Sequence, residues 1–163
     1  MSCDPRHEVL FTPMRIGPVT ARNRFYQVPH CNGMGRLWPT PMSAMRRVKA
    51  EGGWAVVCTE QCDIHPTSNT LKQIRLWDEQ DLPYLSRTAD QIHEYGSLAG
   101  IELVHNGFRV SNLESREVAL APSARPVSGI YPTSARAMDS QDIKNYRKWH
   151  RAAALNARTA GFD

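Results

Sequence analysis

Three stretches of this sequence carry side chains that can do chemistry, and each lies at the end of an apolar run. Residues 28–31 read Val-Pro-His-Cys, residues 59–62 read Thr-Glu-Gln-Cys, and the third stretch runs from Glu102 to His105. Together they hold thiols, carboxylates, an amide and imidazoles, but neither a serine–histidine pairing nor a P-loop. If the runs are parallel strands, their carboxyl ends meet at one sheet edge, where α/β folds bind ligands.

The first stretch suggests a site built from backbone as well as side chains. Pro29 cannot donate to a strand ladder, so it turns the backbone at the sheet edge. Backbone amides at such a turn can bind a planar heterocycle that has both donors and acceptors. A flavin is one such ring among several that the residue types allow.

The expected strands follow from hydrophobic pattern and turn signals. Residues 8–24 are expected to form a small hairpin, because Gly17 and Pro18 mark a turn. Nearly continuous apolar runs are typical of parallel strands buried on both faces, and they predict strands at about 25–30, 54–62 and 99–105.

Helical signals separate these strands. Thr40 precedes Pro41, a pair that predicts a helix cap and first helical residue, and Asp81 is expected to cap a second helix. A third helix is expected to begin at Asp139 or Ser140. Its apolar face would consist of Ile143, Tyr146, His150, Ala153, Ala157 and Ala160, with His150 packed rather than acting as a ligand. Residues 106–138 are expected to be a long irregular segment.

The alternation of strands and helices places the chain in the α/β class. A doubly wound sheet and a (β/α)8 barrel both fit this order. The glycines at 33 and 35 do not complete a dinucleotide fingerprint, because Trp38 occupies the third glycine position. The barrel is therefore favoured. Since a full barrel needs about 250 residues, we expect residues 1–163 to be one partial domain. It would hold a short hairpin and about three βα units, and end before strand four is complete.

Composition excludes several other classes. Hydrophobic residues make up 41% and charged residues 22%, which is typical of a globular domain. The net charge of +4 is scattered, so no nucleic-acid partner is expected, and no apolar run is long enough to span a membrane. The N-terminus lacks the apolar centre of a signal peptide, which predicts a cytoplasmic protein. The spacing of the cysteines at 3, 31, 58 and 62 predicts free thiols and no metal site.

Motifs along the whole chain resemble the Old Yellow Enzyme family of FMN oxidoreductases. The opening resembles the family in Leu10-Phe-x-Pro13, Ile16-Gly-Pro18 and Arg22-Asn-Arg-Phe25. Further motifs resemble its trimethylamine and dimethylamine dehydrogenase branch. These lie at residues 25–31, 48–54, 59–60, 76–79, 94–103 and 112–116.

The resemblance implies an FMN site on this chain. Cys31 matches a cysteine that in this branch is bonded through sulfur to the flavin, and residues 28–30 match backbone that lies against the ring. Glu102 matches an acidic residue near the flavin pyrimidine edge. The expected cofactor-binding set is Val28, Pro29, His30, Cys31, Glu60, Gln61 and Glu102.

The resemblance also implies a substrate class. Gln61 stands where the trimethylamine enzyme has a cage tyrosine, and an amide acceptor suits a secondary amine or N-methylated amino acid. Hydride transfer to flavin would yield an iminium, which hydrolyses to the demethylated amine and formaldehyde. The resemblance places the catalytic residues and an iron–sulfur cluster beyond residue 163, so the 163 residues alone are expected to be inactive. It implies an electron-transfer acceptor and a homo-oligomeric parent. The alternatives are an ene-reductase or 2,4-dienoyl-CoA reductase using NAD(P)H, or a non-catalytic half-barrel remnant.

Overall fold

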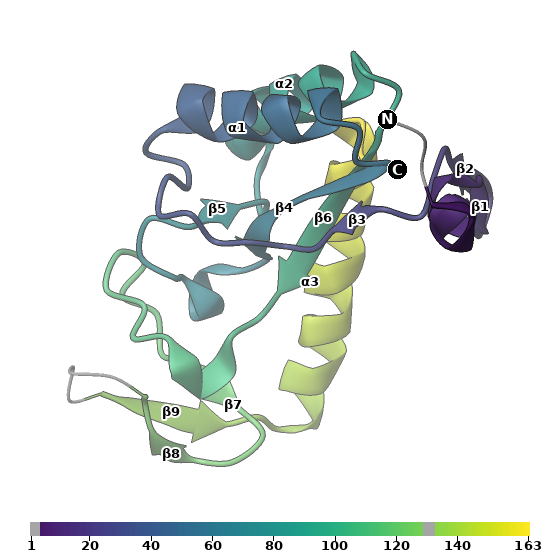
Figure 1. The fold of residues 1–163 in the computed structure, drawn as a ribbon. Coiled ribbons are helices and arrows are strands. Elements are labelled where there is room, and N and C mark those ends of the chain that lie inside the picture. The colour runs from purple at the N-terminus through teal and green to yellow at the C-terminus, as the bar shows by residue number, and fades with distance from the viewer. Residues whose placement is uncertain (1–3, 129–132) are drawn as a thin grey trace.

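A parallel sheet with helices on one side forms the centre of the computed structural model, which describes residues 4–128 and 133–163. The strand β4 (Val56–Asp63) pairs in parallel with β3 (Tyr26–Gln27), β5 (Ile74–Arg75) and β6 (Leu98–Val104). The crossover helices are α1 (Pro39–Glu51), α2 (Leu82–His93) and α3 (Ser140–Thr159). Figure 1 shows α1 and α2 side by side over the sheet, with α3 running along β6. The predicted α/β class and three βα units are confirmed.

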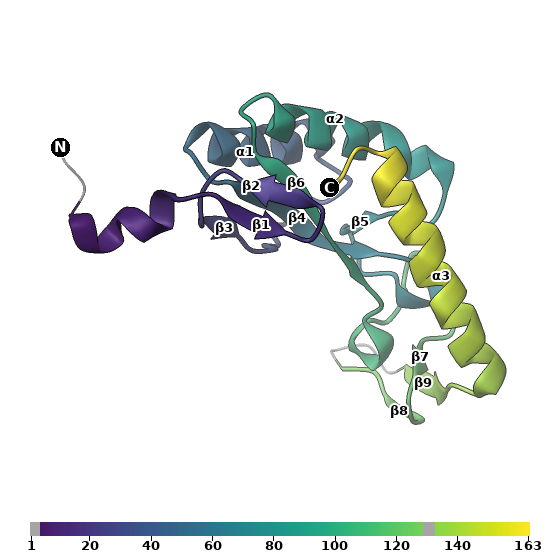
Figure 2. The same cartoon turned by 90° about the vertical axis from the view of Figure 1, so that its right-hand side faces the viewer.

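The predicted hairpin is present at the amino ends of the strands. It consists of β1 (Met14–Ile16) and β2 (Val19–Ala21), which pair antiparallel around Gly17. A 3₁₀ segment, η1 (Pro5–Phe11), precedes it, so the first residues of the expected hairpin are helical instead. Figure 2 shows this hairpin beside the start of the sheet. Ala21 packs there against buried residues at the start of β4.

The main core lies between the sheet and the helices. Ala99 of β6 is buried, and Ile101 and Leu103 pack on the same cluster, so alternate residues of β6 face the helices. The fully buried members of this core include Met42, Val57, Cys62, Ile74, Leu76, Leu85, Ala89 and Ile92. The opposite face of β6 is therefore the one that is not covered by these helices.

Two helix starts differ from the expectation. Helix α1 begins at Pro39, with Trp38 as its cap and no side-chain cap, because Pro39 rather than Pro41 takes the early position that proline tolerates. Asp81 does precede α2, but its carboxylate bonds Arg75 Nε at 2.9 Å instead of capping the helix. Asp139 caps α3 through a reciprocal capping box, as expected from its position.

The apolar face of α3 is only partly buried. Ala153, Ala157 and Ala160 lie in or beside the core, but Ile143 is 53% exposed and His150 is half-buried. The first turns of α3 extend past the carboxyl end of the sheet, toward β7 and β9 (Figure 2). The periodicity predicted the apolar face of α3 correctly. It did not show that the core covers only part of that face.

The segment after β6 is not irregular. After a 3₁₀ turn, η4 (Gly107–Arg109), it forms a small sheet of order β7-β9-β8, from Leu120–Ala121, Arg125–Pro126 and Ser134–Ala137. Its own apolar cluster is Ala119, Ala121, Val127 and Ala135, with Phe108 against it. The strands are too short to show a period in the sequence. Residues 129–132 of the expected irregular segment, like Cys3, lie outside the described residues.

The excursion between β4 and α2 is likewise organised into short elements. It contains η2 (Pro66–Ser68), β5 and η3 (Glu79–Asp81).

Over the described ranges 4–128 and 133–163, no helix is both long and apolar enough to cross a membrane.

Asn112 fastens the excursion after β6 to the excursion after β4. It is 1% exposed, and its backbone φ of 51° is in the left-handed region that asparagine tolerates. Its Oδ1 accepts from Asn69 N at 2.7 Å, and its Nδ2 donates to Thr67 O at 2.9 Å and Glu117 O at 3.1 Å. One side chain thus satisfies three buried or part-buried backbone groups on two loops.

Replacing Asn112 by alanine is expected to lower the free energy of unfolding by about 2–4 kcal/mol, because buried backbone groups lose their partners. Chemical denaturation of the protein made from its complete gene measures this. Asn112→Gly, which removes the strain but not the loss of hydrogen bonds, should be nearly as damaging. Asn145→Ala on the surface of α3 is the control and should change stability by less than about 0.5 kcal/mol. A wild-type value for Asn112→Gly would show that backbone strain, not bonding, explains the residue.

Candidate functional site

The structure brings the three chemical stretches to one sheet edge. Val28 and Cys31 follow β3, whose Gln27 pairs with Val57 of β4. Farther along β4, Gln61 is paired in register with Glu102 of β6. The carboxyl ends of all three strands therefore meet, as expected for a parallel sheet.

A bulge in β4 decides which side chains face the open side of the sheet. Cys58 pairs with Gly100 and Gln61 pairs with Glu102, so three steps on β4 match two on β6. One extra residue reverses the alternation of side chains beyond it. Gln61 therefore follows Cys58 on the open face with Glu102, whereas Glu60 turns inward and is 0% exposed.

The open face carries a neutral phenol beside a close strand contact. Cys58 Sγ lies 3.0 Å from Tyr26 Oη, within hydrogen-bond distance, and this contact together with burial raises the pKa of Tyr26 to about 12. A Cβ at Gly100 would lie 2.4 Å from Cys58 Sγ, so only glycine fits there. Tyr26 remains 49% exposed. It is a neutral polar group on this face at physiological pH.

Gln61 and Glu102 present unsatisfied polar groups on the same face. Gln61 is half-buried and Glu102 is exposed, and neither side chain has a hydrogen-bond partner within residues 4–128 and 133–163. An amide and a carboxylate on paired positions can accept N–H donors from a ligand.

Residues 28–31 have the chemistry that a flavin ring needs. Val28 is 63% exposed and Cys31 presents a free, exposed thiol. The backbone N–H groups of His30 and Cys31 have no acceptor in the described part of the chain. An apolar surface with free donors suits a flat ring whose edge carries acceptor atoms. The donor set therefore fits FMN.

Glu60 does not line this surface. Its Oε2 accepts from Asn32 N at 3.4 Å, and its Oε1 has no partner among the described residues. Burial raises the pKa of this carboxyl, while the bond from Asn32 opposes that shift. Any effect of Glu60 on a ligand passes through the segment that follows β3.

His105 faces away from the site, toward α3. Gly107 N donates to His105 Nδ1 at 3.3 Å, and His105 Nε2 lies 3.0 Å from Thr67 Oγ1. Thr67 Oγ1 lies 2.8 Å from His65 Nδ1, and His65 stacks on Trp149 at 3.6 Å between ring centroids. One arrangement satisfies this chain: His105 Nε2–H donates to Thr67, whose hydroxyl donates to His65. Both imidazoles must then be neutral.

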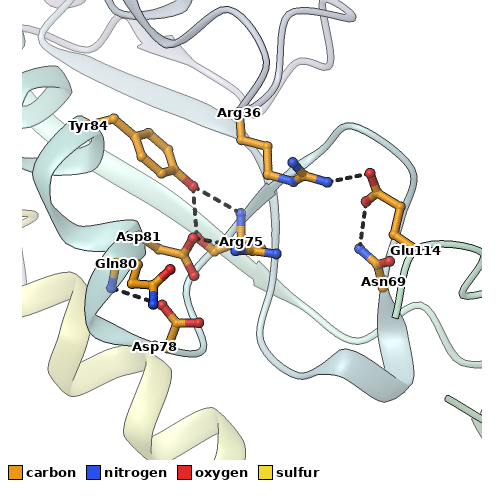
Figure 3. Close-up of polar contacts among 8 residues, drawn as sticks. All are labelled: Arg36, Asn69, Arg75, Asp78, Gln80, Asp81, Tyr84 and Glu114. Atoms are coloured by element: carbon orange, nitrogen blue, oxygen red, sulfur yellow. Dashed lines mark hydrogen bonds and ion pairs between the residues drawn. The ribbon is translucent and has the colours of Figure 1, made fainter. Parts of the chain in front are cut away.

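The loops at this edge are tied together by polar contacts that the sequence did not reveal. Arg36 pairs with Glu114, whose Oε2 accepts from Asn69 Nδ2 at 3.3 Å (Figure 3). A Cβ at Gly35 would lie 1.6 Å from Lys72 O, so the loop after Cys31 packs tightly against the excursion before α2. The only sequence signal was the motif at residues 112–116, which gave no partners.

A second network supports β5 beside these loops. Arg75 Nε bonds Asp81, and Tyr84 Oη donates to Arg75 O at 2.9 Å (Figure 3). Burial raises the pKa of Asp81, and Arg75 opposes that shift. These residues hold the end of the sheet rather than contact the open face.

Other features of the described residues carry less chemistry. No group of three or more histidine, cysteine, aspartate or glutamate side chains in ranges 4–128 and 133–163 could hold a metal ion. A hollow of about 620 Å³ lined by Phe11, Phe25 and Trp54 lies at the amino ends of the strands, opposite the unsatisfied polar groups. We therefore place the site at the carboxyl edge.

Comparison with known proteins shows the family of the chain. Residues 9–163 match the family described as NADH:flavin oxidoreductase / NADH oxidase. The chain is 43% identical to dimethylamine dehydrogenase from Hyphomicrobium sp. (strain x), over 100% of the chain and 23% of that protein. It resembles the structure of histamine dehydrogenase from Rhizobium sp. 4-9 with a TM-score of 0.95 and 48% identity, over 99% of the chain and 25% of the other.

A third relative is named for its action on another nitrogen compound. The structure of 6-hydroxypseudooxynicotine amine oxidase from Pseudomonas geniculata N1 gives a TM-score of 0.94 and 44% identity, over 98% of the chain and 24% of the other. The chain thus spans about a quarter of the length of these relatives. The described sheet corresponds to the N-terminal part of a TIM barrel, which confirms the barrel expectation over the doubly wound one.

The histidine chain predicts a specific pH dependence. Burial lowers the pKa of His65 and of His105 to about 4, below the ordinary 6.5. The unfolded state therefore binds these protons first, and stability is lost as pH falls from about 6.5 toward 4. Each pKa unit of difference corresponds to about 1.4 kcal/mol. His105→Gln should flatten the fall of the melting temperature over this window.

Asp63 has an opposite effect on stability over an overlapping pH range, so the histidine effect must be measured by comparing the variant with wild type. Burial raises its pKa to about 6 from 3.8, so its contribution falls as pH rises over an overlapping window. The wild-type slope is thus a sum of opposite effects, whereas the difference between wild type and His105→Gln isolates the histidine. Exposed His7→Gln is the control and should keep the wild-type slope. Equal slopes for His105→Gln and wild type would contradict the neutral chain.

Proposed function

Because this chain belongs to the NADH:flavin oxidoreductase / NADH oxidase family, we propose that the protein is an FMN-dependent amine dehydrogenase acting on a secondary amine or an N-methylated amino acid. Residues 1–163 form the first part of its FMN-binding barrel domain. The observation that carries the proposal is the exposed Cys31 thiol at the same sheet edge as the unsatisfied Gln61 and Glu102.

The relatives support an amine as substrate. Their names denote a dimethylamine dehydrogenase, a histamine dehydrogenase and an amine oxidase, and the identities are 43%, 48% and 44%. A protonated amine needs hydrogen-bond acceptors and negative charge at its site. The Gln61 amide and the Glu102 carboxylate offer both, on paired positions of adjacent strands.

The cofactor is assigned to the segment after β3. The backbone of Val28, Pro29 and His30 would lie against the ring, with the free N–H groups of His30 and Cys31 pointing to its acceptor atoms. Cys31 is the proposed point of covalent attachment. Glu102 would lie toward the pyrimidine edge, and Glu60 would act from behind the segment.

The chain's own residues bind and orient the amine. When bound, FMN supplies the two-electron acceptor for a hydride from the carbon next to the amine nitrogen. The Gln61 side-chain oxygen accepts an N–H of the ammonium and so fixes that carbon. Val28 offers an apolar contact that excludes water, and Tyr26 stays neutral because its pKa is raised to about 12.

The remaining expectations from the resemblance stay predictions. These are an iron–sulfur cluster, an electron-transfer acceptor, a homo-oligomer, a cytoplasmic location and the inactivity of these 163 residues alone.

Cys31→Ala should abolish covalent flavin. After acid precipitation, the intact mass of wild type from the complete gene is expected to include FMN, whereas the variant should show the mass of the polypeptide alone. Cys58→Ala removes a buried thiol from the same face and is the matched control, which should keep the added mass. Wild type that releases all of its FMN would contradict covalent attachment and favour an NAD(P)H-dependent ene-reductase or dienoyl-CoA reductase.

Gln61→Tyr should shift preference away from secondary amines. An aromatic ring in place of the amide removes an acceptor but adds a cation–π surface for a trimethylated cation. Loss of a hydrogen bond to a charged group costs about 1.5–3 kcal/mol, or roughly 10–100-fold in kcat/KM for dimethylamine. Steady-state kinetics with dimethylamine and trimethylamine test this. An unchanged ratio of the two kcat/KM values would remove Gln61 from the substrate site.

A further inference from the structure

Side chains form hydrogen bonds with the backbone of the segment that carries Cys31 at three positions. The bonded residues alternate along the segment. Gln27 Nε2 donates to Val28 O. Arg46 Nη2 donates to His30 O at 2.6 Å, and Asn32 N donates to Glu60 Oε2 at 3.4 Å. The residues with these backbone hydrogen bonds are 28, 30 and 32. Cys31 therefore lies between two hydrogen-bonded neighbours, while its own side chain stays exposed.

The backbone hydrogen bond on either side of Cys31 is made by a buried charged side chain. Arg46 on α1 and Glu60 on β4 are both 0% exposed, although charged residues are almost never fully buried without a partner. The two do not pair directly with each other, but each affects the other's titration. Burial lowers the pKa of Arg46 and the charge of Glu60 opposes this, whereas burial raises the pKa of Glu60 and the charge of Arg46 opposes that.

Two buried atoms confirm that these charges are not simply satisfied by each other. Arg46 Nε and Glu60 Oε1 have no hydrogen-bond partner within the described residues. Arg46 Nη1 donates to Gln27 Oε1 at 3.4 Å. The side chains that bind Val28 O and His30 O are therefore connected to each other. Packing alone would be served better by apolar side chains, because burying incompletely bonded charges is costly.

From this arrangement we infer that Arg46 and Glu60 are positioning residues, which fix the backbone on both sides of Cys31 and so set the place of its sulfur relative to the open face. The inference rests on the proposed flavin site and deepens it. The bulge in β4 is what turns Glu60 inward to reach Asn32.

Arg46→Met tests the inference, because methionine keeps much of the volume and removes both donors. Arg47→Met is the matched control, since Arg47 is the next residue of α1 and bonds Glu94 at 2.9 Å on the other side, away from the segment. Both variants are made in the holoenzyme from the complete gene. Hydrogen exchange of the Asn32 amide, which Glu60 binds, is measured together with the fraction of protein that carries covalent flavin.

We expect exchange of the Asn32 amide to be about tenfold faster or more in Arg46→Met, because the segment loses a bond to a charged group. Covalent flavin should fall in the same variant, and Arg47→Met should match wild type in both measurements. Glu60→Gln is the second variant if Arg46→Met does not fold. It keeps an acceptor for Asn32 but removes the charge, and exchange should still rise.

Wild-type exchange of the Asn32 amide in a folded Arg46 or Glu60 variant would overturn the inference. Faster exchange that also appears in Arg47→Met would overturn it too, because the effect would then be a general loosening of α1. Wild type without covalent flavin contradicts the attachment in the proposed function, and the exchange comparison still decides whether Arg46 and Glu60 hold the segment.

Discussion

One extra residue in β4 is the constraint on which the candidate site depends. The bulge between Cys58 and Gln61 lets a strand buried on both faces send an amide to the open side and a carboxylate to the inside. Without it, Glu60 would stand beside Glu102, and two like charges on paired positions would repel each other. With it, the open face keeps a single carboxylate and the inner side gains the acceptor for Asn32.

The edge of the sheet is rigid on one side and open on the other. Behind it, polar side chains connect the loops, through buried Asn112 to the excursion after β4 and through Arg36 and Glu114 to the loop after Cys31. In front of it, Val28 and Tyr26 remain exposed. A site built in this way holds its chemistry on fixed backbone, and little of that backbone needs to reorder when a ligand arrives.

Much of the fold could be predicted from the sequence, because its signals are local. The apolar runs located β4 and β6, and Asp139 marked the start of α3. The prediction took Pro41 as the first residue of α1, but the helix begins at Pro39, because proline is tolerated early in a helix at either position. The small sheet after β6 went unpredicted because strands of two to four residues carry no period.

Candidate site residues could be named from the sequence, but their contacts could not. Strand ends named Cys31, Gln61 and Glu102, which the structure brings to one sheet edge. They also named Glu60, and no local signal shows that the bulge turns its side chain inward. Arg46 lies in a helix pattern that looks like a solvated face, and only the tertiary structure shows that it is buried. A long-range carbonyl contact of this kind leaves no mark on local sequence.

The close approach of Cys58 to Gly100 has an evolutionary consequence. The sulfur occupies the space that a Cβ at position 100 would need, so the two positions share one volume. Across homologues they should vary as a pair, with a small residue at 58 wherever 100 acquires a side chain. A larger side chain at either position alone would crowd β4 and β6 beneath Gln61 and Glu102, so this pair limits which residues the two strands can carry there.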